Sequence, residues 1–293
     1  MPHYENFFPL QILLKLENLQ PIGSFKLRGA CNAIEQLSAA ELVDGVYTAS
    51  AGNFAQGLSW NARQRHLPCQ VIVPETAPAA KLDAISRLGG IITKVPFDRW
   101  WKIIQDKHME GMMGHFIHPV VDPHVMAGNG TVGLEILEDV HGVDAVLIPY
   151  GGGALCAGIA TVVKAISPKT KVFACEVETA APLKAALIAG QVIECDYSRS
   201  FVDGIGSKSV LSDMWPIVQD LLDDSLVVSL EQISEAIKLL VERNHIVAEG
   251  AGAAPVAAAL AGLAGHGKIV CVVSGGNINS GHLIKILQGQ LPN

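Results

Sequence analysis

Short apolar runs alternate along the chain with longer segments in which apolar residues recur every three or four positions. The apolar runs predict β-strands at Gln11–Leu16, Gly45–Ala49, Gln70–Val73, Gly90–Val95, Ala145–Pro149, Lys171–Cys175 and Ile269–Val273. Segments with helical periodicity lie between most of them, such as Ala79–Leu88, Gly130–Val140, Ala154–Ile166 and Leu230–Arg243. Repeated strand–helix alternation favours an α/β fold with open, mostly parallel sheets flanked by helices.

The composition agrees with sheets that are covered on both faces. Hydrophobic residues make up 49% of the 293 residues and charged residues 17%, and the mean hydropathy is +0.34. This length allows one large domain or two intertwined domains. The formal net charge is −7, and lysine and arginine form no cluster. We therefore expect no nucleic-acid partner and no binding to anionic membranes.

Neither a membrane span nor a disulfide framework is predicted. The most apolar stretch, residues 250–265, contains Pro255 and is too short to cross a bilayer, so we interpret it as a buried alanine-rich helix. The N-terminus lacks the basic and apolar regions of a signal peptide. Six cysteines are scattered without a C-x-x-C pair. This pattern favours free thiols in a reducing cytoplasm and gives no sign of a structural zinc site.

The stretch GSFKLRGA places a lysine near a predicted helix start. An apolar face that begins at Leu27 predicts the helix, and Ser24 is a favourable N-cap residue. Lys26 then falls at about the second helical position, where the helix dipole disfavours an ammonium group and favours the neutral amine. A neutral lysine amine is a nucleophile toward carbonyl groups. Taken alone, the stretch also fits an exposed lysine beside a helix cap.

A second stretch, IPYGGGALCAG, joins a predicted strand to a predicted helix through Gly151, Gly152 and Gly153. Consecutive glycines let backbone N–H groups surround an anion at a helix N-terminus, although a tight strand–helix turn has the same pattern. A dinucleotide fingerprint would require glycine in place of Cys156, and Glu176 is the only feature in its favour. No P-loop lysine follows the glycines.

Two further turns carry polar groups. In TASAGNFAQG a strand ends and Ser50-Ala51-Gly52-Asn53 leads into a helix, which suits a carboxylate or phenolic oxygen and also suits a simple capped junction. In IVCVVSGGN, Ser274 follows a buried strand, at the end where open α/β sheets hold ligands.

In this order, the four stretches resemble the pyridoxal-phosphate enzymes of the tryptophan-synthase-β fold, and specifically the threonine/serine dehydratase and serine racemase family. LKLENLQPIGSFKLRGA is the most specific part of a resemblance that runs from about Leu13 to Leu287. It implies the two-domain fold type II of pyridoxal-phosphate enzymes. The larger, cofactor-binding domain is expected at 1–44 and 122–293, and the smaller, substrate-side domain at 45–121.

The resemblance also implies roles for individual residues. Lys26 would hold pyridoxal 5'-phosphate covalently, residues 151–155 would bind its phosphate, and Ser274 would contact its ring nitrogen. The full expected cofactor set is Phe25, Lys26, Asn53, Gly151, Gly152, Gly153, Ala154, Leu155, Gly204, Glu249 and Ser274. The expected substrate-carboxylate set is Ser50, Ala51, Gly52 and Asn53.

The activity implied is elimination of water from a β-hydroxy-α-amino acid such as L-threonine or L-serine, which yields a 2-keto acid and ammonia. Two alternatives stay open. One is another β-elimination or β-replacement reaction, such as that of a hydroxyaspartate ammonia-lyase. The other is a homologue that binds the cofactor with weak or no activity. By the same analogy we expect a homodimer.

Four departures from the family pattern matter. Ala51 stands where racemases carry a serine, so we expect little racemisation. Phe54 replaces a common histidine, which leaves the substrate open. Pro182 stands at an acidic position of the racemase cation site, where Glu176 and Ala180 fit, so we expect that site to be altered or absent. The chain is short at both ends relative to the family, and we expect no C-terminal effector domain.

Overall fold

The computed structural model describes residues 10–292 of the chain. They form two compact units. The first unit contains residues 10–16 and 132–292, and the second unit is Glu17–Thr131. The chain therefore passes from one unit to the other twice, between residues 16 and 17 and between residues 131 and 132.

The first unit is built on a five-stranded sheet with the order β1-β9-β6-β7-β8. Its strands are β1 (Gln11–Leu16), β6 (Ala145–Pro149), β7 (Lys171–Val177), β8 (Asp224–Val228) and β9 (Lys268–Val273). Every neighbouring pair is parallel, and Cys271 of β9 lies opposite both Leu14 and Leu147. The parallel sheet expected from the strand–helix alternation is confirmed.

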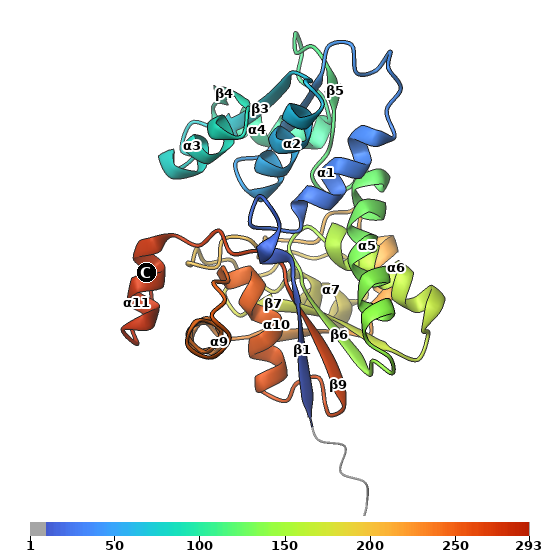
Figure 1. The fold of residues 1–293 in the computed structure, drawn as a ribbon, viewed down its shortest axis with the longest axis vertical. Helices are drawn as coiled ribbons and strands as arrows, with labels where there is room; N and C mark the ends of the chain where they lie inside the picture. Colours follow the sequence, from blue (N-terminus) through green and yellow to red (C-terminus); the bar gives the residue numbers. More distant parts are fainter. Residues whose placement is uncertain (1–9, 293) are drawn as a thin grey trace, which may run out of the picture. The chain divides into compact units, whose positions relative to one another are not determined.

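Helices cover both faces of this sheet (Figure 1). The helices of this unit are α5 (Pro123–Asp139, which begins in the second unit), α6 (Ala154–Ile166), α7 (Pro182–Ala189), α8 (Trp215–Leu221), α9 (Leu230–Asn244), α10 (Gly250–Leu260) and α11 (Ser280–Leu287), of which α11 packs on α9. Ala145 and Leu147 of β6 belong to the apolar cluster that α9 and α10 share. The alternate residues Val146 and Ile148 are also fully buried, which places them on the face that α6 covers.

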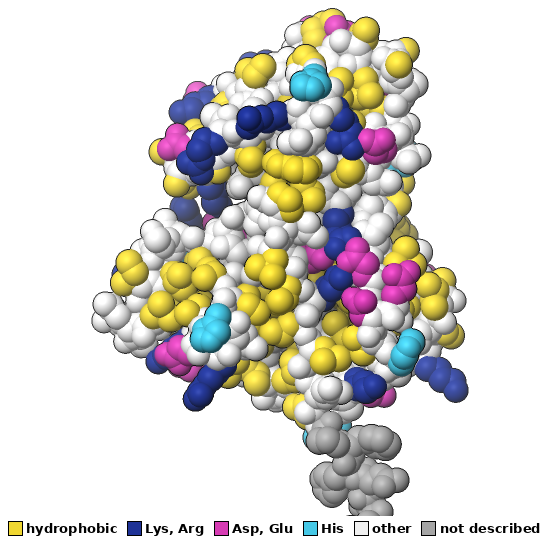
Figure 2. Space-filling model, viewed as in Figure 1, with side chains coloured by type: hydrophobic (Ala, Val, Ile, Leu, Met, Phe, Trp, Pro, Cys, Tyr) yellow, Lys and Arg dark blue, Asp and Glu magenta, His cyan; other side chains and the backbone are white. Residues whose placement is uncertain are grey.

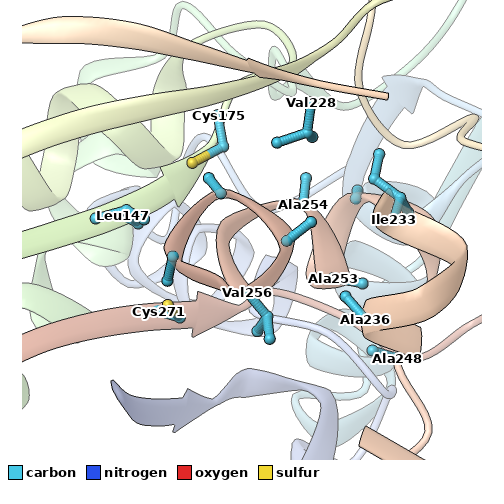
Figure 3. Close-up of a cluster of buried hydrophobic side chains, with 14 of the residues drawn as sticks. Leu147, Cys175, Val228, Ile233, Ala236, Ala248, Ala253, Ala254, Val256 and Cys271 are labelled. Atoms are coloured by element: carbon cyan, nitrogen blue, oxygen red, sulfur yellow. The ribbon is translucent and has the colours of Figure 1, made fainter. Parts of the chain in front are cut away.

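Helix α10 is the alanine-rich helix expected from the sequence, and it continues past Pro255. Figure 3 shows its Ala254 and Val256 among Leu147, Cys175 and Cys271 of the sheet. Small side chains allow the helix to lie close to the strands, and ten of its residues are buried. No helix among residues 10–292 is long and apolar enough to cross a membrane.

The second unit has a four-stranded parallel sheet with the order β4-β3-β2-β5. Its strands are β2 (Val46–Ala49), β3 (Cys69–Pro74), β4 (Ile91–Val95) and β5 (His115–Phe116). Its helices are the short 3-10 helix η1 (Glu17–Leu19), α1 (Lys26–Glu35), α2 (Asn53–Gln64), α3 (Ala79–Arg87) and α4 (Phe97–Asp106).

The two units divide the chain at different residues from the domains expected from the sequence. Residues 17–44 group with the second unit because α1 packs tightly on α2. A Cβ on Gly57 of α2 would lie 2.9 Å from the backbone oxygen of Lys26. Residues 1–9 of the expected larger domain lie outside the described residues.

Asp223 of the first unit gives a pH-dependent stability prediction. It accepts hydrogen bonds from Lys164 at 2.5 Å, from Lys171 at 2.8 Å and from the backbone N–H of Val172 at 2.8 Å. Burial raises the pKa of this carboxyl, but the two lysines and the N–H outweigh burial and leave the pKa below its usual value. A carboxyl whose pKa is lowered in the folded state stabilises the fold at pH values above its unfolded-state pKa, near 3.8. That stabilisation is lost as the pH falls through the folded-state pKa.

We therefore expect Asp223→Asn to lower the free energy of unfolding by about 1–2 kcal/mol at pH 7. The difference from the wild-type chain should shrink below pH 3.8. Urea denaturation at pH 7 and at a pH below 3.8 measures this difference in unfolding free energy. A deficit of equal size at the two pH values would contradict the stabilising role of the ionised Asp223 carboxylate.

Candidate active site

The glycine loop Gly151–Gly153 joins β6 to the N-terminus of α6 in the first unit. Gly153 holds the N-cap position in the left-handed region, with φ of +101°. A Cβ on Gly151 would lie 3.1 Å from the backbone oxygen of Gly204. Side chains in place of these glycines would fill the space around the loop. The loop also lies beside a helix N-terminus, whose first N–H groups have no partner within the helix. Such a site suits a phosphate.

Tyr150 directly precedes the glycine loop, and its side chain lies close to Gly153. It is 1% exposed, and its hydroxyl has no hydrogen-bond partner. Burial, with smaller contributions from Cys156 and Glu176, raises the pKa of Tyr150, so the hydroxyl stays protonated. A Cβ on Gly153 would lie 3.2 Å from that hydroxyl oxygen.

Gly153→Ala should therefore weaken binding of a phosphate-bearing ligand. The alanine would be strained at a φ of +101° and would contact the Tyr150 hydroxyl, so the loop must move. We expect at least a tenfold loss of pyridoxal-phosphate affinity, measured by absorbance titration of the purified chain. Gly190→Ala is a matched control, because Gly190 also has a positive φ, of +68°, but no atom within 4 Å of a Cβ. Equal effects of both variants would contradict a special role for the loop.

Three other predicted cofactor residues gather in the first unit. A Cβ on Gly204 would lie 2.9 Å from the Cβ of Ala251 and 3.5 Å from Oε1 of Glu249. The backbone N–H of Glu249 donates to the backbone oxygen of Gly275 at 3.0 Å, directly after Ser274, which is 2% exposed at the end of β9. The structure therefore brings Gly204, Glu249 and Ser274 together, and Gly204 approaches the glycine loop.

Lys26 is the first residue of α1 in the second unit. The prediction that Ser24 caps this helix is wrong. Phe25 holds the N-cap position in a helical conformation with no side-chain cap, and the buried Ser24 hydroxyl has no hydrogen-bond partner. Lys26 therefore lies one position closer to the helix start than expected, where the dipole acts most strongly on its amine.

Two aromatic rings flank the Lys26 amine. Its Nζ lies 4.8 Å from the ring centroid of Phe25 and 5.8 Å from that of Phe54. Phe54 is 2% exposed and belongs to the apolar cluster of the second unit, with Leu58 among others. The residue that departs from the family pattern is thus a core residue whose ring reaches the predicted catalytic amine.

The Ser50–Asn53 turn lies between β2 and α2 in the same unit. The Ser50 hydroxyl accepts a hydrogen bond from the Gly52 N–H at 3.3 Å, and Asn53 begins α2. A Cβ on Gly52 would meet nothing within 4 Å, so this part of the turn faces open space. Ala51 is half-buried and packs against the apolar cluster of the unit. The turn presents donors at a helix N-terminus, as a carboxylate site requires.

Glu176, the residue that favoured a dinucleotide, is already engaged. Its carboxylate accepts hydrogen bonds from the N–H groups of Leu183 and Lys184, both at 2.8 Å, and from the Ser225 hydroxyl at 2.6 Å. Burial raises the pKa of Glu176, and these three donors oppose that rise. Glu176 lies in β7, and its carboxylate binds the N-terminus of α7. This structural role argues against a ribose contact. Within residues 10–292 no cluster of three or more histidine, cysteine or acidic side chains is suited to a metal.

Comparison with known proteins identifies the family. The model of the family described as "Pyridoxal-phosphate dependent enzyme" matches residues 2–275. The chain belongs to this family. The enzyme is 38% identical to an L-threonine ammonia-lyase of Geobacter sulfurreducens, over 94% of this chain and 70% of the relative. It is 37% identical to a catabolic L-threonine dehydratase of Escherichia coli, over 94% of this chain and 85% of the relative.

Solved structures give the same assignment. A serine racemase of Dictyostelium discoideum aligns with a TM-score of 0.84 at 36% identity, covering 92% of this chain and 88% of the racemase. A threonine deaminase of Solanum lycopersicum aligns with a TM-score of 0.86 at 33% identity, covering 96% and 79%. The predicted fold type II and the pyridoxal-phosphate cofactor are confirmed at the level of the family.

The residues present fit this cofactor. The glycine loop of the first unit offers backbone donors for a phosphate, and Lys26 of the second unit offers an amine for an aldehyde carbon. Sequence reasoning missed Tyr150, although an aromatic residue directly before three glycines was a signal that the loop has a bulky support.

Proposed function

We propose that this enzyme is a dehydratase that converts L-threonine into a 2-keto acid and ammonia, and that it acts on L-serine with a lower kcat/KM. The observation that carries the proposal is the Lys26 amine at the start of α1, flanked by two aromatic rings, in a chain 37% identical to a catabolic threonine dehydratase. The net reaction converts threonine to 2-oxobutanoate and ammonia. The water released by the elimination is taken up again when the eliminated product is hydrolysed, so the atoms balance.

In this proposal each predicted site residue has a role toward pyridoxal phosphate or the substrate. Pyridoxal phosphate, when bound, supplies the electron sink that makes the Cα proton of an amino acid acidic. The Lys26 amine would hold the cofactor and would take the Cα proton of the substrate. The Gly151–Leu155 loop would bind the phosphate, Asn53 would donate to the ring oxygen, and the Ser274 hydroxyl would contact the ring nitrogen.

The remaining roles concern the substrate and the surroundings of the cofactor. The Ser50 hydroxyl and the N–H groups of the Ser50–Asn53 turn bind the substrate carboxylate, since the turn faces open space at Gly52. Phe25, Gly204 and Glu249 border the cofactor. By the family resemblance, a serine hydroxyl, rather than a carboxylate, at the ring nitrogen would favour elimination over other reactions of the substrate.

Racemisation is the second candidate activity, because a serine racemase is among the similar structures. Ala51 argues against it, since a methyl group has no proton to deliver to the second face of the substrate Cα. A homodimeric assembly is part of the proposal and rests on the family resemblance. A cytoplasmic location is also proposed and rests on the six scattered cysteines without a C-x-x-C pair.

The test is a keto-acid release assay with the full-length chain and added pyridoxal phosphate. The panel contains L-threonine, L-serine, D-serine and a 3-hydroxyaspartate, which separates the dehydratase from the alternative ammonia-lyases. We expect the highest kcat/KM with L-threonine. Highest turnover of hydroxyaspartate would replace the proposed substrate. Visible absorbance of the bound cofactor without turnover of any member would indicate a binding homologue instead.

A further inference from the structure

Tyr150 reaches the start of α6 because of its place directly after β6. Side chains along a strand alternate between its two faces, and Val146 and Ile148 lie on the face that α6 covers. Tyr150 comes two residues later, and its backbone N–H donates to the oxygen of Cys175 at 2.9 Å, which continues the pairing of β6 with β7. The tyrosine ring is therefore directed to the same face, toward the first turn of α6.

The Tyr150 hydroxyl lies against the N-cap residue of α6. A Cβ on Gly153 would lie 3.2 Å from the hydroxyl oxygen and 3.3 Å from Cε of Met214. Tyr150 is 1% exposed, and its hydroxyl has no hydrogen-bond partner among the described residues. Buried polar groups in folded proteins nearly always have such a partner. This hydroxyl therefore calls for a partner that binds at the start of α6.

The polar side chains near this hydroxyl are engaged elsewhere. The Glu176 carboxylate accepts three hydrogen bonds, from the N-terminus of α7 and from the Ser225 hydroxyl. The Cys156 thiol donates to two backbone oxygens of β6 at 3.8 and 3.6 Å. Burial, with smaller contributions from Cys156 and Glu176, raises the pKa of Tyr150. The hydroxyl therefore keeps its proton and is a donor at the start of α6.

The ligand that fits this place is an anion with several acceptor oxygens. The first N–H groups of α6 have no partner within the helix, and the helix dipole favours negative charge there. Residues 151–155 carry no charged side chain. Figure 2 shows lysine and arginine side chains elsewhere, at the surface over α3 and β4 of the second unit. The loop would therefore hold an anion through neutral donors, and the Tyr150 hydroxyl adds one donor to the backbone N–H groups.

We propose that the Tyr150 hydroxyl is a ligand of the cofactor phosphate and donates a hydrogen bond to one of its oxygens. The chain itself already buries this hydroxyl, so binding gains a charge-assisted hydrogen bond without a further cost for desolvating the donor. The inference deepens the proposed function, because it rests on the role of the glycine loop as the phosphate site.

Tyr150→Phe tests the inference, because it keeps the ring and removes only the hydroxyl. We expect the affinity of the full-length chain for pyridoxal phosphate to fall about tenfold or more, since hydrogen bonds to charged groups are among the strong ones. Pyridoxal has the same ring and aldehyde but no phosphate, and it should bind the wild-type chain and the variant within about twofold. Calorimetric titration measures these affinities. The phosphorus NMR signal of the bound cofactor should also differ between the two chains.

Thermal unfolding without added cofactor gives a second readout. Removing a buried hydroxyl that has no partner should leave the chain at least as stable, so the unfolding temperature of Tyr150→Phe should equal or exceed that of the wild-type chain. Added pyridoxal phosphate should then raise the unfolding temperature less in the variant than in the wild-type chain.

Tyr47→Phe is the matched control. Tyr47 is 2% exposed, but its hydroxyl accepts a hydrogen bond from the Met109 N–H at 3.3 Å and lies 3.5 Å from Nδ1 of His108. This variant loses contacts that the chain itself supplies. It should therefore unfold at a lower temperature without cofactor and keep its affinity for pyridoxal phosphate within about twofold of the wild-type value.

Three results would overturn the inference. The first is an unchanged affinity of Tyr150→Phe for pyridoxal phosphate. The second is an equal loss of affinity for pyridoxal, because the hydroxyl would then not act on the phosphate. The third is a Tyr150→Phe chain that is unfolded or less stable without cofactor, because the hydroxyl would then already have a partner such as a trapped water.

Two further comparisons separate this inference from the proposed function. If Gly153→Ala weakens binding of pyridoxal phosphate relative to pyridoxal and Tyr150→Phe does not, the loop holds the phosphate and only the role of the tyrosine is lost. A wild-type chain that binds pyridoxal phosphate but releases no keto acid would contradict the proposed reaction, and the binding result for Tyr150→Phe would still stand.

Discussion

Lys26→Ala should abolish keto-acid release from L-threonine, lowering kcat/KM by a factor of about 10⁴ or more. The Lys26 amine has two roles in the proposed reaction, since it holds the cofactor and takes the substrate Cα proton. The Lys26 amine lies 4.8 Å from the ring centroid of Phe25 and 5.8 Å from that of Phe54, and neither ring can replace an amine. The visible absorbance of the bound cofactor should change in the same variant, because the alanine leaves no amine to hold it.

This loss should be separate from stability. Removing a cation from a helix N-terminus gains about 0.3–1 kcal/mol, and losing its contact with two rings costs a similar amount. We therefore expect thermal unfolding of Lys26→Ala to stay close to that of the wild-type chain. Lys81→Ala is the control, since Lys81 lies in the first turn of α3 in the same unit. It should keep wild-type activity.

Added small primary amines give a further check. If Lys26 acts through its amine, such amines should restore part of the activity of Lys26→Ala, and the rescued rate should rise with pH as more amine becomes neutral. Full activity of Lys26→Ala without any added amine would remove Lys26 from the mechanism.

The sequence was informative about elements whose pattern is local. All seven predicted strands are confirmed, with ends that differ by at most two residues, because each is an apolar run bounded by turn residues. Two strands were missed for physical reasons. β5 is the pair His115–Phe116, too short to show alternation, and β8 begins with Asp224 and Ser225, which interrupt the apolar pattern.

Side-chain partners distant in sequence were not predictable. The favourable N-cap residue Ser24 is not used, because the chain before α1 turns at Phe25 in a helical conformation. Arg28 pairs with Glu17 and Thr131, which lie 11 and 103 residues away along the chain. Such pairs depend on how helices pack, and a single sequence holds no local signal of that packing.

Phe54 shows where motif reasoning and structure add to each other. The motif indicates only that an apolar ring replaces a histidine. It does not decide which substrate side chain this ring would accept. The structure places this ring in the apolar cluster of the second unit, 5.8 Å from the Lys26 amine. Its first effect is therefore on the surroundings of the amine.

Ala51→Ser should give the enzyme measurable racemase activity. The hydroxyl would stand in the Ser50–Asn53 turn, where the related racemases carry the acid/base of the second substrate face. A positioned general acid contributes a factor of about 10²–10⁴ to proton transfer, so we expect D-serine formation from L-serine to rise at least tenfold. Ala51 is half-buried, so the hydroxyl can be accommodated with little loss of packing.

Chiral chromatography of the products from L-serine measures this change, with keto-acid release followed in the same reaction. Ala51→Gly is the matched control, because it alters the same position without adding a hydroxyl and should form no additional D-serine. If Ala51→Ser retains elimination and D-serine does not increase, residue 51 does not control the second face of the substrate. Substantial D-serine formation by the wild-type chain would mean that another group already delivers that proton, and the preference for elimination could not then be assigned to Ala51.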